Sequence, residues 1–70
     1  MVDVFKTSVR KIRQSQLMLE VLSICFPDSE ISFDLEDCDN ILRIKHEGIP
    51  AEDIIDLLIR YGFHCEELSN

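Results

Sequence analysis

Residues 41–68 restrict the fold of this chain more than any other segment, because their pattern predicts a strand, a helix and a second strand in succession. In the first strand, 41–46, the apolar residues Leu42 and Ile44 alternate with basic residues, and a period of two is typical of a strand that is buried on one face. The second strand, 63–68, is shorter. The three elements together predict a layered fold in which the helix covers a sheet.

The helix between these strands has a clear beginning and end. The fixed φ and missing N–H of Pro50 suit the first turn of a helix, and Glu52 and Asp53 place negative charge at the positive end of the helix dipole. Apolar residues at helical spacing continue as far as Tyr61, and the following Gly62 can adopt the left-handed conformation that ends a helix. The helix is therefore predicted between Pro50 and Gly62.

The N-terminal part of the chain predicts a strand followed by a longer helix. Residues 2–9 alternate and contain Val, Phe and Thr, which favour a strand. Phe5, Thr7 and Val9 share one face of this strand, and the pattern leaves open which face is buried. Ser8 is the expected N-cap of the helix that follows.

That helix is predicted over 11–26 and ends before Pro27, since the residue before a proline is pushed out of the helical conformation. Further apolar residues, including Leu17 and Ile24, flank the stripe that is expected to face the sheet. The apolar arc is wider than a two-layer fold must bury, so it is either a deep core contact or a patch for a partner helix or a second copy of the chain. The sheet-facing stripe follows the helical period and consists of Gln14, Met18, Val21, Leu22 and Cys25.

The remaining strand, 31–35, alternates with Ile31, Phe33 and Leu35 expected to point inward, and a polar hairpin loop joins it to the next strand. The resulting order β–α–β–β–α–β predicts an α+β fold. Its four-stranded antiparallel sheet has the order 4-1-3-2 with two helices on one face, which is the ferredoxin-like arrangement. The 70 residues are expected to form a single domain of this kind, 1–70.

Charge and hydropathy argue against two classes of partner. Fourteen acidic residues oppose seven basic ones, which gives a net charge of −7, and so negative a surface is repelled by nucleic-acid phosphates and by anionic lipids. The longest apolar run, 17–26, is interrupted by Glu20 and Ser23 and is too short to span a bilayer. Residues 1–13 lack the apolar region of a secretory signal. We therefore expect a cytoplasmic protein that binds neither nucleic acid nor membrane.

Cysteine and histidine residues supply the candidate metal ligands. The three cysteines are an odd number without paired spacing, which argues for reduced thiols rather than a disulfide framework. In the predicted topology three loops meet at one end of the sheet, where Asp37 or Asp39 would complete a metal shell. Thiolate and imidazole ligands suit zinc or copper. The candidates at this end are Cys38, His64 and Cys65, although adjacent residues of a regular strand point to opposite faces.

The chain resembles the heavy-metal-associated domains of copper chaperones and of metal-transporting ATPases. The likeness covers nearly all of it and is carried by the strand ILRIKHE, the proline-led helix PAEDIIDLLIRYGF and the triplet FDL. The resemblance implies the ferredoxin-like fold. The family's M-x-C-x-x-C metal motif would fall on 9–14, with Lys11 and Gln14 in place of the two cysteines. A protonated lysine has no lone pair and glutamine is a poor ligand for copper(I), so the family's metal site does not carry over.

Two kinds of function follow from these features. We expect a small non-catalytic binding module, without a cofactor, that contacts a protein partner or a second copy of itself. The alternative is zinc or copper binding at a relocated site formed by Cys38, His64 and Cys65. An enzyme is not expected. Cys65 and the neighbouring His64 could suggest a thiol nucleophile and its base, but the sequence offers no group to orient the base and no oxyanion donors. The expected partner surface consists of apolar residues outside the core stripes, which are Leu17, Ile24, Ile59 and Phe63.

Overall fold

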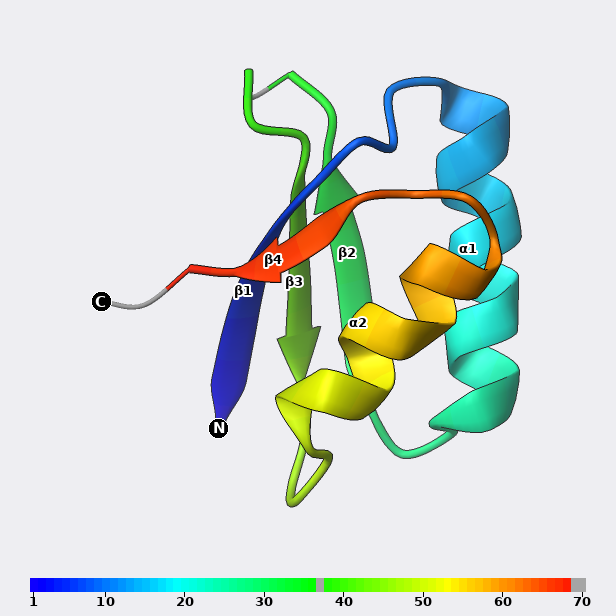
Figure 1. The fold of residues 1–70 in the computed structure, drawn as a ribbon. Helices are drawn as coiled ribbons and strands as arrows, with labels where there is room; N and C mark the ends of the chain where they lie inside the picture. The colour runs from blue at the N-terminus through cyan, green and yellow to red at the C-terminus, as the bar shows by residue number, and fades with distance from the viewer. Residues whose placement is uncertain (37, 69–70) are drawn as a thin grey trace.

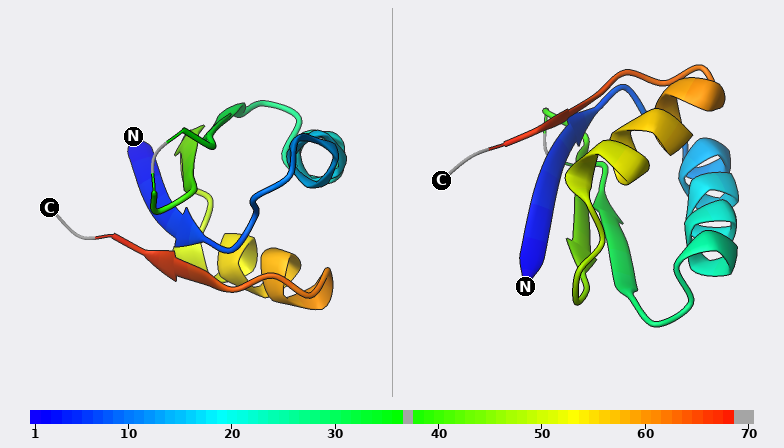
Figure 2. Two further views of the ribbon diagram at one scale, coloured as in Figure 1. Left: turned by 90° about the horizontal axis from the view of Figure 1, so that it is seen from above. Right: turned by 60° about the horizontal axis from the view of Figure 1, so that its bottom comes forward.

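A computed structural model describes residues 1–36 and 38–68 of the chain, and Figure 1 shows its fold. All strand pairs are antiparallel and the sheet has the order β2-β3-β1-β4, which read from the other edge is the predicted 4-1-3-2. Both helices lie on one side of the sheet (Figure 2), so the predicted ferredoxin-like arrangement is confirmed. The elements are β1 Val2–Thr7, α1 Ile12–Cys25, β2 Glu30–Asp34, β3 Ile41–Lys45, α2 Ala51–Arg60 and β4 Cys65–Glu67.

The register of the sheet decides which face of β1 is buried, a point that its sequence left open. Phe5 pairs with Leu42 of β3, and both side chains are fully buried beneath the helices. Thr7 and Val9, which share a face with Phe5, are buried as well, whereas Val2 on the other face is exposed. The inward face of β1 is therefore the one that carries the aromatic ring.

The hydrophobic core joins all the layers of the fold. α1 packs beside β2 and α2 beside β4, as Figure 1 shows. Fully burying one aliphatic or aromatic side chain contributes about 1.5–3 kcal/mol, so the few large side chains of so short a chain supply most of its stability. The core cluster comprises Phe5, Val9, Met18, Leu22, Leu42, Ile44, Ile54, Leu58 and Cys65.

The beginning of α1 differs from the prediction, because Ser8 does not cap the helix. Its Oγ accepts the backbone N–H of His64 at 2.8 Å, and its own N–H donates to the His64 carbonyl at 3.1 Å. The helix is capped instead by Gln14, whose Oε1 accepts the N–H of Lys11 at 3.1 Å and that of Arg10 at 3.3 Å. The prediction was wrong because a chain segment far away in the sequence occupies the serine hydroxyl.

The buried face of α1 is also rotated from the predicted stripe. Its buried residues are Ser15, Met18 and Leu22, which moves the centre of the face by about 50° at 100° per residue. Cys25 was predicted in the stripe and is exposed at the last position of the helix. The rotation turns this side chain away from the middle of the buried face. The same rotation turns Leu17 outward, which decides the character of the exposed surface.

α2 ends as its sequence predicts. Gly62 has a φ of +87°, in the left-handed region that favours glycine. Its N–H donates to the carbonyl of Ile59 at 2.9 Å, and the N–H of Phe63 donates to the carbonyl of Leu58 at 3.0 Å. These two bonds form a Schellman motif, in which the residue after the glycine packs back on the last turn. Phe63 accordingly packs against the core.

Candidate functional site

Apolar side chains are exposed along one side of α1. Leu17 is 47% exposed and Ile24 is 73% exposed. The two are seven residues apart, so they lie on the same side of the helix two turns from one another. Val21 lies between them and is half-buried. We call Leu17, Val21 and Ile24 the α1 flank. Leu17 and Ile24 were predicted to contact a partner, whereas Val21 was predicted in the sheet-facing stripe and is half-buried.

The other two predicted surface residues do not belong to the α1 flank. Ile59 is 56% exposed, but it is not among the residues of α2 that line a cleft shared with the end of α1. Those residues are Asp53, Asp56, Leu57 and Arg60, and Ile59 lies about 100° or more around the helix from the middle of the face that they form. Phe63 is half-buried and closes the end of α2. The structure therefore brings Leu17 and Ile24 together and leaves Ile59 and Phe63 apart from them.

The cleft between the helices adjoins the α1 flank and has an acidic side. Its volume is about 260 Å³. Cys25 follows Ile24 and lies one turn after Val21, so the cleft continues the surface of the flank. On the α2 side of the cleft, Asp53 and Asp56 supply two carboxylates and Arg60 supplies one guanidinium, so this side carries a net negative charge. The lining residues are Cys25, Phe26, Asp53, Asp56, Leu57 and Arg60.

The opposite end of the flank is basic. Arg10, Lys11 and Arg13 are exposed at the beginning of α1, and the first turn of this helix contains no acidic residue. Positive charge at a helix N-terminus opposes the helix dipole. α2 has the opposite arrangement, with Glu52 and Asp53 in its first turn. The surface of the helical layer therefore runs from a basic end, over an apolar flank, to an acidic cleft.

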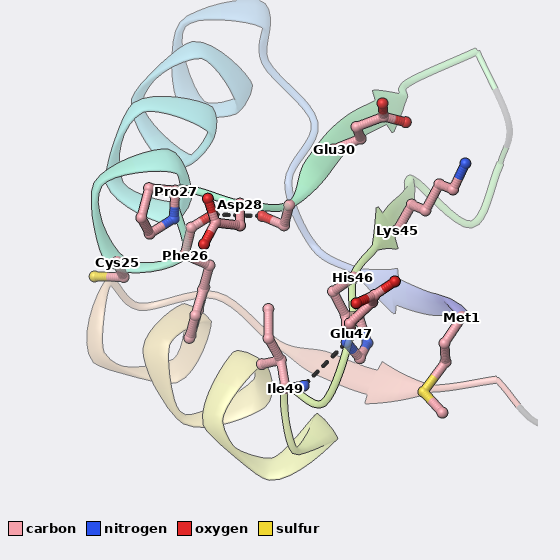
Figure 3. A pocket seen from close by; sticks show the side chains of 11 residues that line it. Met1, Cys25, Phe26, Pro27, Asp28, Glu30, Lys45, His46, Glu47 and Ile49 are labelled. Carbon is pink, nitrogen blue, oxygen red and sulfur yellow. Dashed lines mark hydrogen bonds between the residues drawn. The ribbon is translucent and has the colours of Figure 1, made fainter.

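A second pocket, of about 520 Å³, lies at the end of the sheet where β3 leads into α2, and His46 is among its lining residues (Figure 3). Only 1% of the His46 side chain is exposed. Its Nδ1 accepts the backbone N–H of Ile49 at 3.0 Å, so the ring proton is on Nε2, which donates to Asp3 Oδ2 at 2.7 Å. The pocket is lined by Met1, Cys25, Phe26, Pro27, Asp28, Ser29, Glu30, Lys45, His46, Glu47 and Ile49.

These bonds give His46 a structural role that the sequence did not predict. Its ring joins β1, through Asp3, to the segment that leads into α2, and both ring nitrogens are occupied by protein partners. The imidazole therefore has no free nitrogen with which to bind a ligand. Sequence reasoning placed His46 at the end of a strand only, because the pairing with Asp3 depends on the register of β1 against β3.

The three candidate metal ligands face different surroundings. Cys65 is buried, and burial, with a smaller contribution from Glu66, raises the pKa of its thiol to about 12. His64 is 68% exposed and its Nε2 lies 3.7 Å from Glu66 Oε2. Cys38 is exposed on the hairpin. Within 1–36 and 38–68, no three His, Cys, Asp or Glu side chains are grouped to hold a metal ion. Asp37, a predicted further ligand, lies outside the described residues.

Asp39, the other carboxylate predicted for a metal shell, lies 3.7 Å from Lys6 Nζ. This ion pair connects the hairpin to β1. Thr7 strengthens the same connection, because its N–H donates to the Asp39 carbonyl at 3.3 Å and its hydroxyl donates to the Asn40 carbonyl at 2.7 Å. The hairpin thus lies beside the end of β1, as the topology predicted.

Comparisons with known proteins leave the function to be argued from the residues themselves. No protein-family model matches the chain, and neither a curated protein nor a solved structure matches it. Among the described residues, neither helix has the length and apolar character needed to cross a bilayer.

Proposed function

We propose that this chain is a non-catalytic interaction module that binds a protein partner through the α1 flank. The observation that carries the proposal is the exposure of Leu17 and Ile24 on one side of the same helix. Single exposed apolar residues are normal on a protein surface. Two of them in register, with half-buried Val21 between them, form a stripe of the kind that a partner helix covers.

The neighbouring cleft adds a specific feature to this surface. Phe26 and Leu57 line it with apolar atoms, and Asp53 and Asp56 line it with carboxylates. An apolar stripe gives a partner its affinity, while charges at the rim orient it and exclude partners of the same sign. The preferred partner therefore presents apolar side chains and, at one end, basic ones.

The resemblance to heavy-metal-associated domains supports a module that lacks the family's metal loop. Lys11 stands where the family has its first cysteine, and Gln14 stands where it has the second. The Gln14 side chain accepts the N–H groups of Arg10 and Lys11, so it stabilises the beginning of α1 and is engaged within the chain. A reducing cytoplasmic setting fits the proposal, since Cys25 and Cys38 are both free and exposed.

A photo-crosslinking amino acid placed on α1 tests the proposal. It is introduced singly at Leu17 or Ile24, and at the matched control positions Gln16 and Ser23, in cells that express the protein. Each control residue is exposed and adjacent in sequence, but it faces about 100° away from the α1 flank. Irradiation is expected to give discrete protein adducts from the two flank positions and not from the controls. The same yield from all four positions, or no adduct from the flank, would overturn the proposal.

A further inference from the structure

We infer that the partner of the α1 flank is a second copy of this chain, bound across a two-fold axis with the two α1 helices antiparallel. The inference rests on the proposed function, because it names the occupant of the same surface. A second copy fits the charge at the two ends of the flank and the spacing of the apolar side chains, and it offsets the unfavourable interaction between the basic beginning of α1 and its helix dipole.

Charge at the two ends of the flank is self-complementary. The basic residues Arg10, Lys11 and Arg13 lie at one end, and the cleft with Asp53 and Asp56 lies at the other, beside the last turn of α1. The 14 residues of α1 span about 21 Å at 1.5 Å each. Figure 1 shows that α1 descends toward the end of the fold from which α2 rises, and Asp53 and Asp56 of α2 line one cleft together with Cys25 at the end of α1.

A two-fold axis perpendicular to α1 brings these opposite charges together twice. It lays the basic beginning of each α1 over the end of the other, so Arg13 of one copy faces Asp53 and Asp56 of the second copy, and the reverse contact is identical. An interface of this isologous kind needs one surface patch that complements itself. The helical layer of this protein has such a patch. In an antiparallel copy the order of basic end, apolar flank and acidic cleft is reversed, so each basic end lies opposite an acidic cleft.

The apolar residues fit the same axis. Leu17 and Ile24 lie at equal distances from the middle of the α1 flank. In the antiparallel arrangement Leu17 of each copy therefore packs against Ile24 of the other copy. Val21 lies close to the axis and packs near its own counterpart. Four large exposed side chains, two from each copy, are thereby removed from water in one continuous strip.

The arrangement also relieves one unfavourable feature of the single chain. Positive charge at the beginning of α1 opposes the helix dipole, and carboxylates of the second copy would stand next to it. A net charge of −7 makes two copies repel one another in general, so association requires a local match of this kind. Glu20 lies beside the flank and near the axis, so the Glu20 carboxylates of the two copies would repel one another.

Charge reversal with complementation is the test, read by analytical ultracentrifugation of the purified, reduced chain over a range of concentrations. One variant carries Lys11→Glu and Arg13→Glu, and the other carries Asp53→Lys and Asp56→Lys. The unaltered chain is expected to dimerise. Each variant alone is expected to dimerise at least tenfold more weakly, because like charges then meet at both ends of the interface.

An equimolar mixture of the two variants is expected to restore association to within a few fold of the unaltered chain. In the mixed dimer every basic end again faces an acidic one. Restoration also shows that both variants are folded. The control Arg43→Glu with Lys45→Glu changes the net charge by the same amount and sign as Lys11→Glu with Arg13→Glu, but on the face of the sheet away from the helices, and is expected to weaken the dimer less than threefold. Glu20→Gln is expected to strengthen it severalfold.

The outcomes separate this inference from the proposed function. A chain that stays monomeric at all concentrations, while the flank positions crosslink to a different protein, overturns the second copy and keeps the interaction module. A monomeric chain without flank adducts overturns both. A dimer whose mixture of variants does not regain affinity overturns the antiparallel arrangement.

Discussion

Removing the ring of His46 is the substitution whose effect on stability the structure defines best. His46→Ala eliminates the hydrogen bond from Ile49 N–H to Nδ1 and the bond from Nε2 to the Asp3 carboxylate. The first is a neutral hydrogen bond worth about 0.5–1.5 kcal/mol, and the second involves a charged group and is worth about 1.5–3 kcal/mol. The sum is roughly 2–4.5 kcal/mol. A chain of 70 residues has a free energy of unfolding of roughly 4–10 kcal/mol.

Urea unfolding at neutral pH, followed by circular dichroism, measures this loss. With a slope of about 1 kcal/mol per molar urea for so small a domain, the midpoint is expected to fall by roughly 2–4 M. His64→Ala is the matched control. It removes an imidazole that is 68% exposed, and its effect is expected to stay within about 0.5 kcal/mol.

A double-mutant cycle assigns the loss to the bond itself. Asp3→Ala, His46→Ala and the double variant are expected to give a coupling free energy of about 1–3 kcal/mol between the two side chains. His46→Asn and His46→Gln refine the result, because the first can still accept from Ile49 and the second can still reach Asp3. A loss below about 1 kcal/mol for His46→Ala, or a coupling near zero, would refute the reasoning.

Three further predictions concern the core. The raised pKa and the burial of Cys65 predict that at pH 8 a thiol reagent modifies Cys25 and Cys38 promptly and Cys65 only on unfolding; three equally reactive thiols would contradict this. Because unfolding returns the Cys65 thiol to its ordinary pKa of 9.0 from about 12, its contribution to the free energy of unfolding is complete below pH 9 and is lost as the pH rises toward 12. Leu58→Ala is expected to lower the free energy of unfolding by about 2–5 kcal/mol, because Leu58 is fully buried. Ile59→Ala changes the next residue, which is exposed, and is expected to change this free energy by less than about 1 kcal/mol. Similar losses for the two variants in urea unfolding would show that the two faces of α2 are wrongly assigned.

The ends of α2 show what local sequence predicts well. Pro50 and Gly62 act through their own backbone preferences, which operate wherever these residues stand, and the helix occupies the residues between them with the glycine at positive φ. The alternation of Leu42 and Ile44 with basic residues likewise predicted a strand with one buried face, and both residues are buried in β3.

The candidate site was predicted in part. Leu17 and Ile24 could be found because they lie outside the expected stripe of α1, and both are exposed on one flank. Ile59 was chosen by the same reasoning but is not among the residues of α2 that line the cleft with α1, because a helical period locates a residue on its own helix and not relative to the neighbouring one. The acidic cleft was not predicted, since its two sides come from separate helices.

The sequence by itself determined the order of elements, the ends of α2 and the class of fold, because backbone preferences and apolar periods act over a few neighbouring residues. Tertiary structure decided how far α1 rotates about its axis, since an apolar arc wider than the sheet contact can be buried in more than one way and packing selects among them. It also decided that the hydroxyl of Ser8 binds His64 rather than capping α1, and that Asp3 meets His46. Each of these contacts joins residues that only the register of the sheet brings together.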